Sequence, residues 1–201
     1  MHDRAAVVPA TPKTDCALRV ARDYPDELPH LEQVARLAAL LFRSLGQVHK
    51  LGPHECELLC CAALLHDVGI SVSYPGHHKK SLKLILRAEL PALTAREREI
   101  VANVARYHRK AKPSAKHQAF ARLPAEDQQL VCKLAAILRL ADGLDRAHEN
   151  AVSAVEASAD PQGWAVAIAG PGSLAYAASS ARRKADLFED VYDVKIRFEP
   201  G

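Results

Sequence analysis

The run of apolar residues from Leu58 to Leu65 constrains the fold of this chain more than any other segment. Its sequence, LLCCAALL, is apolar on every side of a helix, which is typical of a central helix that other helices surround. The run ends at His66 and Asp67, and both residue types are common metal ligands. On its own, the pair is explained more simply by a helix end at which the two side chains hydrogen-bond each other. The rest of the chain must decide between these alternatives.

Helical patterns dominate the chain from about residue 13 to residue 148. Apolar residues recur at helical spacing after His30, and breakers such as Gly46 and Pro75 separate the segments. A loop is predicted over 69–80 and a long lysine-rich connection over 109–124. Residues 1–12 have no hydrophobic period and are predicted to be a disordered tail. The predicted helices span 14–24, 30–45, 53–65, 78–88, 94–107 and 126–147.

The pattern changes after residue 150. Short alternating or β-branched runs predict strands over 151–159 and 164–169, a helix over 173–192 and a strand over 194–198. The predicted fold class is therefore mainly α, with a helical bundle over 13–150 and a small α+β (β-β-α-β) appendage over 151–201 packed on it. A chain of 201 residues has room for one sizeable core and such an appendage, but not for two full domains.

Composition excludes several classes of protein. No apolar stretch approaches the ~20 residues that span a bilayer, and the N-terminus lacks the apolar region of a signal peptide. The five cysteines are odd in number and show no CxxC spacing, which favours buried thiols in a reducing compartment. A net charge of +3 is too small to indicate nucleic-acid binding. We therefore expect a cytoplasmic protein without membrane or nucleic-acid partners.

Two further residues connect His66 and Asp67 to a larger set. His30 shares a helical face with Val34, so it points toward the core. Asp142 lies within the apolar helical segment ILRLADGLDR, where a buried carboxylate is costly unless it is paired or binds metal. A lone histidine at such a position is most often a hydrogen-bonded core residue. Four inward-facing residues on three predicted helices are explained more simply by one shared site.

These motifs resemble the HD superfamily of metal-dependent phosphohydrolases, with HLEQVA at His30, LLHDVG at His66 and LADGLD at Asp142. The segments SYPGHHKKS, ARYHRKAKP and LAAILRLADGLDR resemble the C-terminal HD-like region of the exopolyphosphatase and guanosine-pentaphosphate phosphohydrolase (Ppx/GppA) family. In that family an HD-like helical domain is followed by a small α+β segment. The family's N-terminal actin-like domains have no counterpart before residue 30, so polyphosphatase activity is not carried over.

The resemblance implies a site for one or two divalent ions of the group Mn, Fe, Zn, Ni, Co and Mg. The implied ligands of the first ion are His30, His66, Asp67 and Asp142. Two-metal members of the superfamily add two histidines, for which His77 and His108 are the candidates here. His77 is preferred to His78 because it precedes Ser81 by four residues. The alternative is that these are exposed loop histidines beside lysines, so the sequence leaves open whether a second ion binds.

Asp67 is also the candidate catalytic residue, because its carboxylate can orient or deprotonate an attacking water. Basic residues near the extra histidines and near Asp142 are candidates for binding substrate phosphate, although a solvated charged face is their default role. These candidates are Lys79, Lys80, Arg109, Lys110, Arg139 and Arg146. No role is assigned to His2, His49, His54, His117 or His148.

Two functions of different classes are compatible with these patterns. The first is a metal-dependent phosphohydrolase that acts on a nucleotide or another small phosphorylated compound. The second is a catalytically silent regulatory module that binds nucleotide or polyphosphate, or pairs as a homodimer. The complete set of HD ligands favours the hydrolase, because a decayed site should have lost one of them.

Overall fold

The structure is a computed structural model that describes residues 7–201. The predicted disordered tail therefore lies half outside the described residues. In the other half, Val7 and Val8 pack against the core and Pro12 begins the first helix. The helical part consists of α1 (Pro12–Ala21), α2 (Leu28–Ser44), α3 (Gly46–His49), α4 (Pro53–Leu65), α5 (His77–Arg87), α6 (Ala95–Arg106), α7 (Gln118–Ala121) and α8 (Ala125–Leu144).

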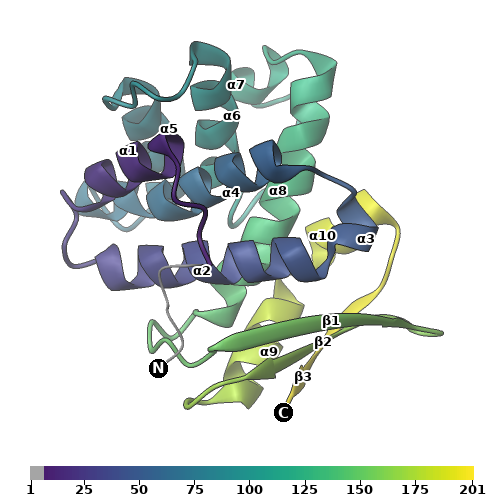
Figure 1. Cartoon of the computed structure of the whole chain (residues 1–201). Helices are drawn as coiled ribbons and strands as arrows, with labels where there is room; N and C mark the ends of the chain where they lie inside the picture. The colour runs from purple at the N-terminus through teal and green to yellow at the C-terminus, as the bar shows by residue number, and fades with distance from the viewer. Residues whose placement is uncertain (1–6) are drawn as a thin grey trace.

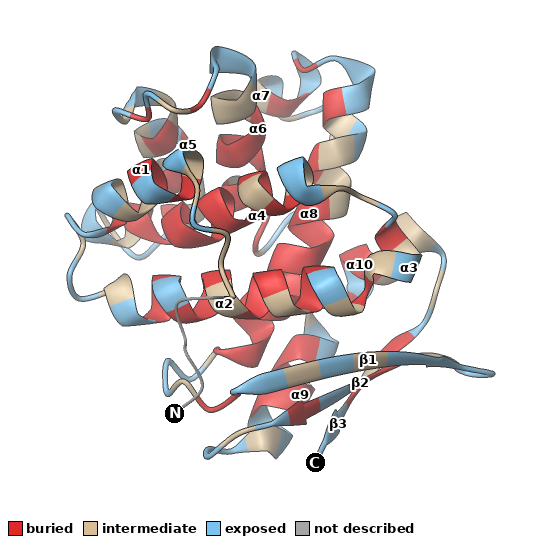
Figure 2. Cartoon of the chain, viewed as in Figure 1, coloured by how far each residue is buried: buried red, intermediate tan, exposed pale blue. Residues whose placement is uncertain are grey.

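Helix α4 lies at the centre of the helical part, as its apolar sequence predicts (Figure 1). Helices α1, α2, α6 and α8 pack against it, and every residue from Leu58 to Leu65 is buried (Figure 2). The helix begins after Gly52, whose N–H donates a hydrogen bond of 2.8 Å to the Glu55 carboxylate. Because His66 directly follows this buried helix, its side chain lies in the interior of the protein.

Several local predictions differ from the structure. The second helix begins at Leu28, two residues before its predicted start, because Pro29 lies in the first turn of α2, where its missing N–H is not needed. The predicted loop over 69–80 contains a 3₁₀ helix, η2 (Val68–Ser71), and α5 already begins at His77. His77 and His78 therefore lie in the first turn of a helix, which restricts where their rings can point.

The C-terminal part contains β1 (Ala154–Asp160), β2 (Gly163–Ala169), α9 (Leu174–Arg183), α10 (Asp186–Tyr192) and β3 (Ile196–Pro200). The strands form one sheet in the order β1-β2-β3, in which β1 and β2 are antiparallel and β2 and β3 are parallel. The single helix predicted over 173–192 is divided at Lys184 and Ala185. The predicted class, mainly α with a small C-terminal α+β part, is confirmed.

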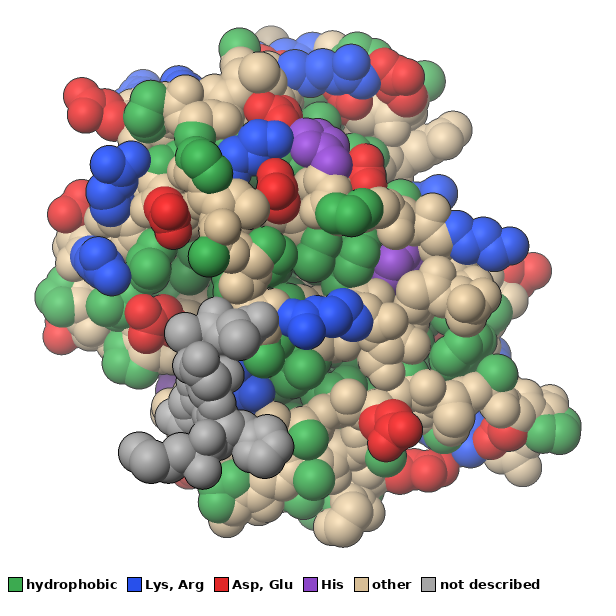
Figure 3. Space-filling view, in the orientation of Figure 1, with side chains coloured by type: hydrophobic (Ala, Val, Ile, Leu, Met, Phe, Trp, Pro, Cys, Tyr) green, Lys and Arg blue, Asp and Glu red, His purple; other side chains and the backbone are tan. Residues whose placement is uncertain are grey.

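The small sheet is attached to the helical part through two helices. Strand β1 runs alongside α2, and α9 packs against β2 and β3 as well as against α8 (Figure 1). On the face shown in Figure 3, Lys and Arg side chains are scattered among Asp and Glu side chains. Over residues 7–201, no helix is both long and apolar enough to cross a membrane.

Candidate metal centre

The six side chains predicted as metal ligands converge at one buried place. They come from α2, the end of α4, the start of α5, the end of α6, and α8. Their ligand atoms form three overlapping groups of three, and within each group the atoms lie within 4.8 Å of one another. All six side chains are buried. The groups are His30, His66 and Asp67; His66, His108 and Asp142; and Asp67, His77 and His108.

Three of the histidines are anchored in the same way. The Nδ1 atoms of His66, His77 and His108 lie 2.8, 2.9 and 2.7 Å from the carbonyl oxygens of the residues three positions earlier. A carbonyl oxygen can only accept a hydrogen bond, so Nδ1 carries the proton in each ring. Each Nε2 atom then presents a lone pair toward the centre, which is the form in which histidine binds metal.

His30 is anchored by a carboxylate instead of a carbonyl. Its Nδ1 donates to Asp145 Oδ2 at 2.8 Å, and both side chains are almost completely buried. Asp145 also accepts a hydrogen bond of 2.9 Å from the Asn150 N–H. His148, to which no role was assigned, stacks on the His30 ring at a centroid distance of 3.7 Å. Asp145 was not among the site residues predicted from the sequence. Its position three residues after Asp142, on the same side of the predicted helix, is the only pattern in the sequence that could have indicated it.

Acceptor atoms face one another across the centre without a hydrogen between them. Asp67 Oδ1 lies 3.1 Å from His77 Nε2 and 3.2 Å from His108 Nε2. Within the described part of the chain, Asp67 Oδ1 and the Nε2 atoms of His30 and His66 have no hydrogen-bond partner. Buried acceptors that face each other are unfavourable unless a cation lies among them. The donor set therefore fits a divalent ion that prefers imidazole and carboxylate ligands.

The charge states of these groups also suit metal binding. Burial raises the pKa of Asp67, but His66, His108 and His77 outweigh it and hold this pKa well below its usual value. Lys184 and nearby histidines likewise keep the pKa of Asp142 low against the effect of burial. Burial lowers the pKa of His66, and it lowers that of His108 to about 3. The carboxylates are thus ionised and these two imidazoles neutral at pH 7, as metal ligands must be.

His30 differs from the other histidines in its titration. Burial lowers its pKa, but the hydrogen bond to Asp145 and the charges of Asp142 and Asp145 together raise the pKa above its ordinary value. The same Asp145 carboxylate that orients the ring therefore also increases its basicity. A more basic imidazole is a stronger metal ligand once its Nε2 proton has been displaced.

A close contact between η2 and α5 places His77 beside Asp67. A Cβ atom at Gly69 would lie 2.3 Å from the His77 carbonyl oxygen and 2.5 Å from the Ser81 nitrogen. Only glycine therefore allows this approach. The Gly69 N–H donates to Ser81 Oγ at 3.0 Å, which fixes the contact. The segment after the His-Asp pair is in this way tied to the helix that carries His77.

A cleft of about 190 Å³ opens onto Asp67, His108 and Asp142. Its remaining lining residues are all cationic: Arg109, Lys110, Arg146 and Lys184. The structure thus brings three of the six predicted phosphate-binding residues, Arg109, Lys110 and Arg146, to this cleft. Lys184, at the end of α9, was not predicted from the sequence.

The other three predicted phosphate-binding residues do not line the cleft. Arg139 donates to Asp186 at 3.0 Å and to the Lys110 carbonyl at 3.3 Å, so its guanidinium joins α8 to α10. Lys80 Nζ lies 3.4 Å from the Ser73 carbonyl oxygen, and Lys79 is exposed on α5. Because Lys79 follows His77 by two residues in α5, its side chain points to a different side of the helix from that of His77.

Tyr74 lies beside the cleft and is 55% exposed. Hydrogen bonds from Arg146 and Arg109 lower the pKa of its hydroxyl, and the Arg109 guanidinium lies 5.7 Å from the centre of its ring. Arg109 also contacts His77, with 3.2 Å between Nη1 and Nε2. The His77 lone pair thus already has a cationic partner, which a second metal ion would have to replace.

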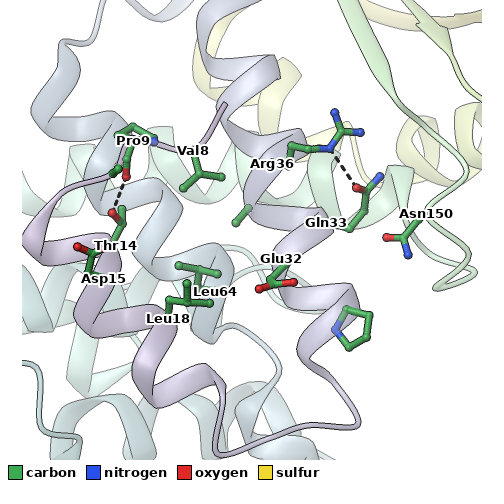
Figure 4. A pocket seen from close by; sticks show the side chains of 13 residues that line it. Val8, Pro9, Thr14, Asp15, Leu18, Glu32, Gln33, Arg36, Leu64 and Asn150 are labelled. Atoms are coloured by element: carbon green, nitrogen blue, oxygen red, sulfur yellow. Dashed lines mark hydrogen bonds between the residues drawn. The ribbon is translucent and has the colours of Figure 1, made fainter. Parts of the chain in front are cut away.

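A larger pocket of about 560 Å³ lies elsewhere, among the N-terminal segment, α1 and α2 (Figure 4). None of the six clustered residues lines it. Two of its polar contacts are internal, because the Thr14 hydroxyl donates to the Pro9 carbonyl and Arg36 donates to Gln33. The chemistry of the described chain therefore gathers at the smaller cationic cleft.

Comparison with known proteins points to one family. The family model described as Ppx/GppA phosphatase, domain III, matches residues 14–171. A guanosine-5'-triphosphate,3'-diphosphate pyrophosphatase from Pseudoalteromonas translucida (strain TAC 125) is 28% identical over 82 residues, which cover 39% of this chain and 16% of that protein. Only a small part of that relative thus corresponds to the present chain.

Proposed function

This chain belongs to the Ppx/GppA phosphatase domain III family, and from that premise we propose that it is a metal-dependent phosphohydrolase acting on a nucleotide or another small phosphorylated compound. The observation that carries the proposal is a set of buried polar atoms, Asp67 Oδ1 and the Nε2 atoms of His30 and His66, that have no hydrogen-bond partner in the described chain. The order of His30, His66-Asp67 and Asp142 also supports kinship with the HD superfamily, which we include in the proposal.

The residues of the centre would take separate roles in hydrolysis. His30, His66, Asp67 and Asp142 would hold the ion, which when bound lowers the pKa of a water ligand and polarises a phosphoryl oxygen. Asp67 is the carboxylate in the cleft that can orient the attacking water and accept its proton. Arg109 and Arg146 face the same cleft, where a guanidinium can donate two parallel hydrogen bonds to a phosphate group.

A second ion at Asp67, His77 and His108 is a separate part of the proposal. These residues form one of the three ligand groups, and Asp67 also belongs to the group of His30 and His66. Crystals soaked in excess Mn should then show two peaks about 3.5–4 Å apart. A single peak, with Arg109 still on His77, would reduce the site to one ion and leave His77 as an anchor for Arg109.

A silent binding module is the second candidate, and two contacts favour it. Lys184 forms an ion pair with Asp142, and Arg109 contacts His77, so two of the six ligands have internal cationic partners. A protein that uses these cations to bind nucleotide or polyphosphate would not need an ion. The two candidates differ in whether the chain takes up metal and releases phosphate.

The test combines metal analysis with a phosphate-release screen across nucleotides. We expect the purified wild type to bind at least one Mn, Co or Ni ion, and His66→Ala to lose this binding. The control is His54→Ala, because the His54 side chain is 51% exposed and pairs with Glu97 far from the centre. Asp67→Asn keeps the size of the side chain but removes its charge, so it should abolish turnover. Wild-type protein that binds nucleotide but takes up no metal would establish the silent module instead.

A further inference from the structure

Lys184 lies in the C-terminal part of the chain, directly after α9, yet its ammonium group reaches the metal centre of the helical part. Its Nζ atom forms an ion pair with Asp142 Oδ2. The Lys184 side chain is 18% exposed and that of Asp142 is 5% exposed, so solvent screens this pair poorly. The α+β part therefore contributes a charged group to the cleft and is more than a structural appendage.

Gly143 explains how α9 comes so close to Asp142. A Cβ atom at Gly143 would lie 2.6 Å from the Cα atom of Ala181 and 3.0 Å from its nitrogen, so a side chain here would displace α9. Asp142 precedes this contact by one residue, and Lys184 follows Ala181 by three. The Lys184 N–H donates to the Ala181 carbonyl at 3.0 Å, which closes the last turn of α9. The close crossing of α8 and α9 thus presents Lys184 to Asp142.

The position of Lys184 gives it two kinds of partner. Asp142 Oδ1 faces His30 Nε2 at 3.8 Å, while Oδ2 faces Lys184, so the carboxylate lies between the ammonium and the ligand set. Lys184 also lines the cleft together with Arg109 and Arg146. An ammonium has three donors, so it can hold Asp142 and still donate to another acceptor in the cleft.

A purely structural ion pair explains these observations less well. Arg139 and Lys112 already join this region of the helical part to α10, because both pair with Asp186. A further pair made only for stability would not need a half-buried lysine inside a cleft of cations. A buried carboxylate that is reserved for a metal ion, in contrast, needs a positive partner whenever the ion is absent.

We propose that Lys184 is the resident cation of this centre, which neutralises Asp142 before metal binds and donates to a phosphate oxygen of the bound ligand afterwards. The inference rests on the proposed function, since it assigns a role within the same site. It implies that metal and Lys184 compete for Asp142, whereas metal and Lys184 cooperate in binding phosphate. Removing the ammonium should therefore change the two affinities in opposite directions.

The test is calorimetry of Mn binding to the metal-free protein, followed by titration of inorganic phosphate into the Mn-loaded protein. Lys184→Met and the more polar Lys184→Gln should bind Mn roughly tenfold more tightly, because a neighbouring positive charge is gone. Both should bind phosphate roughly tenfold more weakly, because a charge-assisted hydrogen bond is lost. Lys184→Arg should restore phosphate binding. Lys112→Met is the matched control, because Lys112 pairs with Asp186 and Asp190 outside the cleft, and it should leave both affinities unchanged.

Two results would overturn the inference. Unchanged affinities in both neutral variants would show that Lys184 contacts neither ligand. Weaker binding of Mn as well as phosphate, together with a lower melting temperature, would show a structural pair. If the wild type takes up no Mn at all, the proposed function fails first, so the two failures are distinguishable.

Discussion

Asp145→Asn is the sharpest test of how the protein prepares its metal ligands. The Asp145 carboxylate accepts two hydrogen bonds, one of 2.8 Å from His30 Nδ1 and one of 2.9 Å from the Asn150 N–H. An asparagine has a single acceptor oxygen, so it can satisfy only one of these donors and must present its NH2 group to the other. The His30 ring would then lose either its anchor or its fixed orientation, although the substitution hardly changes the volume.

The expected magnitude follows from the burial of this pair. The side chains of His30 and Asp145 are 2% and 1% exposed, so the lost bond is a buried, charge-assisted one, worth about 1.5–3 kcal/mol. Mutating the groups that hydrogen-bond to metal-binding histidines typically weakens metal affinity by about 10–100-fold. We therefore expect the Kd for Mn to rise by about 30-fold, which corresponds to about 2 kcal/mol.

Calorimetric titration of Mn into wild type and variant measures this change directly. Asp26→Asn, at an exposed loop position, makes the same chemical change away from the centre and should leave the Kd unaltered. Circular dichroism must show that the variant is folded. A folded Asp145→Asn protein that binds Mn as tightly as the wild type would refute the view that His30 is a ligand oriented by Asp145.

Two further predictions concern stability. Gly69→Ala should lower the free energy of unfolding by about 1–3 kcal/mol, because its Cβ would lie 2.3 Å from a backbone oxygen. Gly46→Ala is the control and should not lower it, because nothing lies within 4 Å of the added Cβ. Equal urea midpoints for the two variants would contradict this prediction. The stability of the metal-free protein, kept in a chelator, should fall as the pH falls from about 6.5 toward 3. In this range the unfolded chain takes up a proton at His108, whereas the folded protein does not, because the pKa of the folded His108 is about 3. His108 contributes at most about 1.4 kcal/mol per pH unit to the slope of unfolding free energy against pH. Urea unfolding at a series of pH values should show a smaller slope for His108→Gln. An identical slope in the variant would exclude His108 as its source.

Much of the fold could be predicted from local patterns. The central helix, the order of the long helices and the change to an α+β part after residue 150 all follow from hydrophobic periodicity, which each segment carries by itself. Errors occur at boundaries, because α2 includes Pro29 and α5 already begins at His77, and in the helix predicted over 173–192, which is divided into α9 and α10. Helix ends depend on which backbone groups find partners, and that is not a property of the period.

The residues of the centre were also accessible from the sequence, because a buried polar side chain on an apolar helix is conspicuous. His30, His66, Asp67 and Asp142 stand out in this way, and the structure brings them together with His77 and His108. Their role as ligands stays a prediction until metal is measured.

The partners of the charged residues were decided by tertiary structure alone. Arg139 and Lys184 are both basic residues, and in the sequence Arg139 is much the nearer to Asp142. Yet Arg139 binds Asp186 while Lys184, from the distant α9, binds Asp142. Local sequence determines which face of a helix is apolar, since that depends on spacing along one segment. It does not determine which ions meet, because this depends on how closely two helices cross, and here that crossing is allowed by the missing side chain of Gly143.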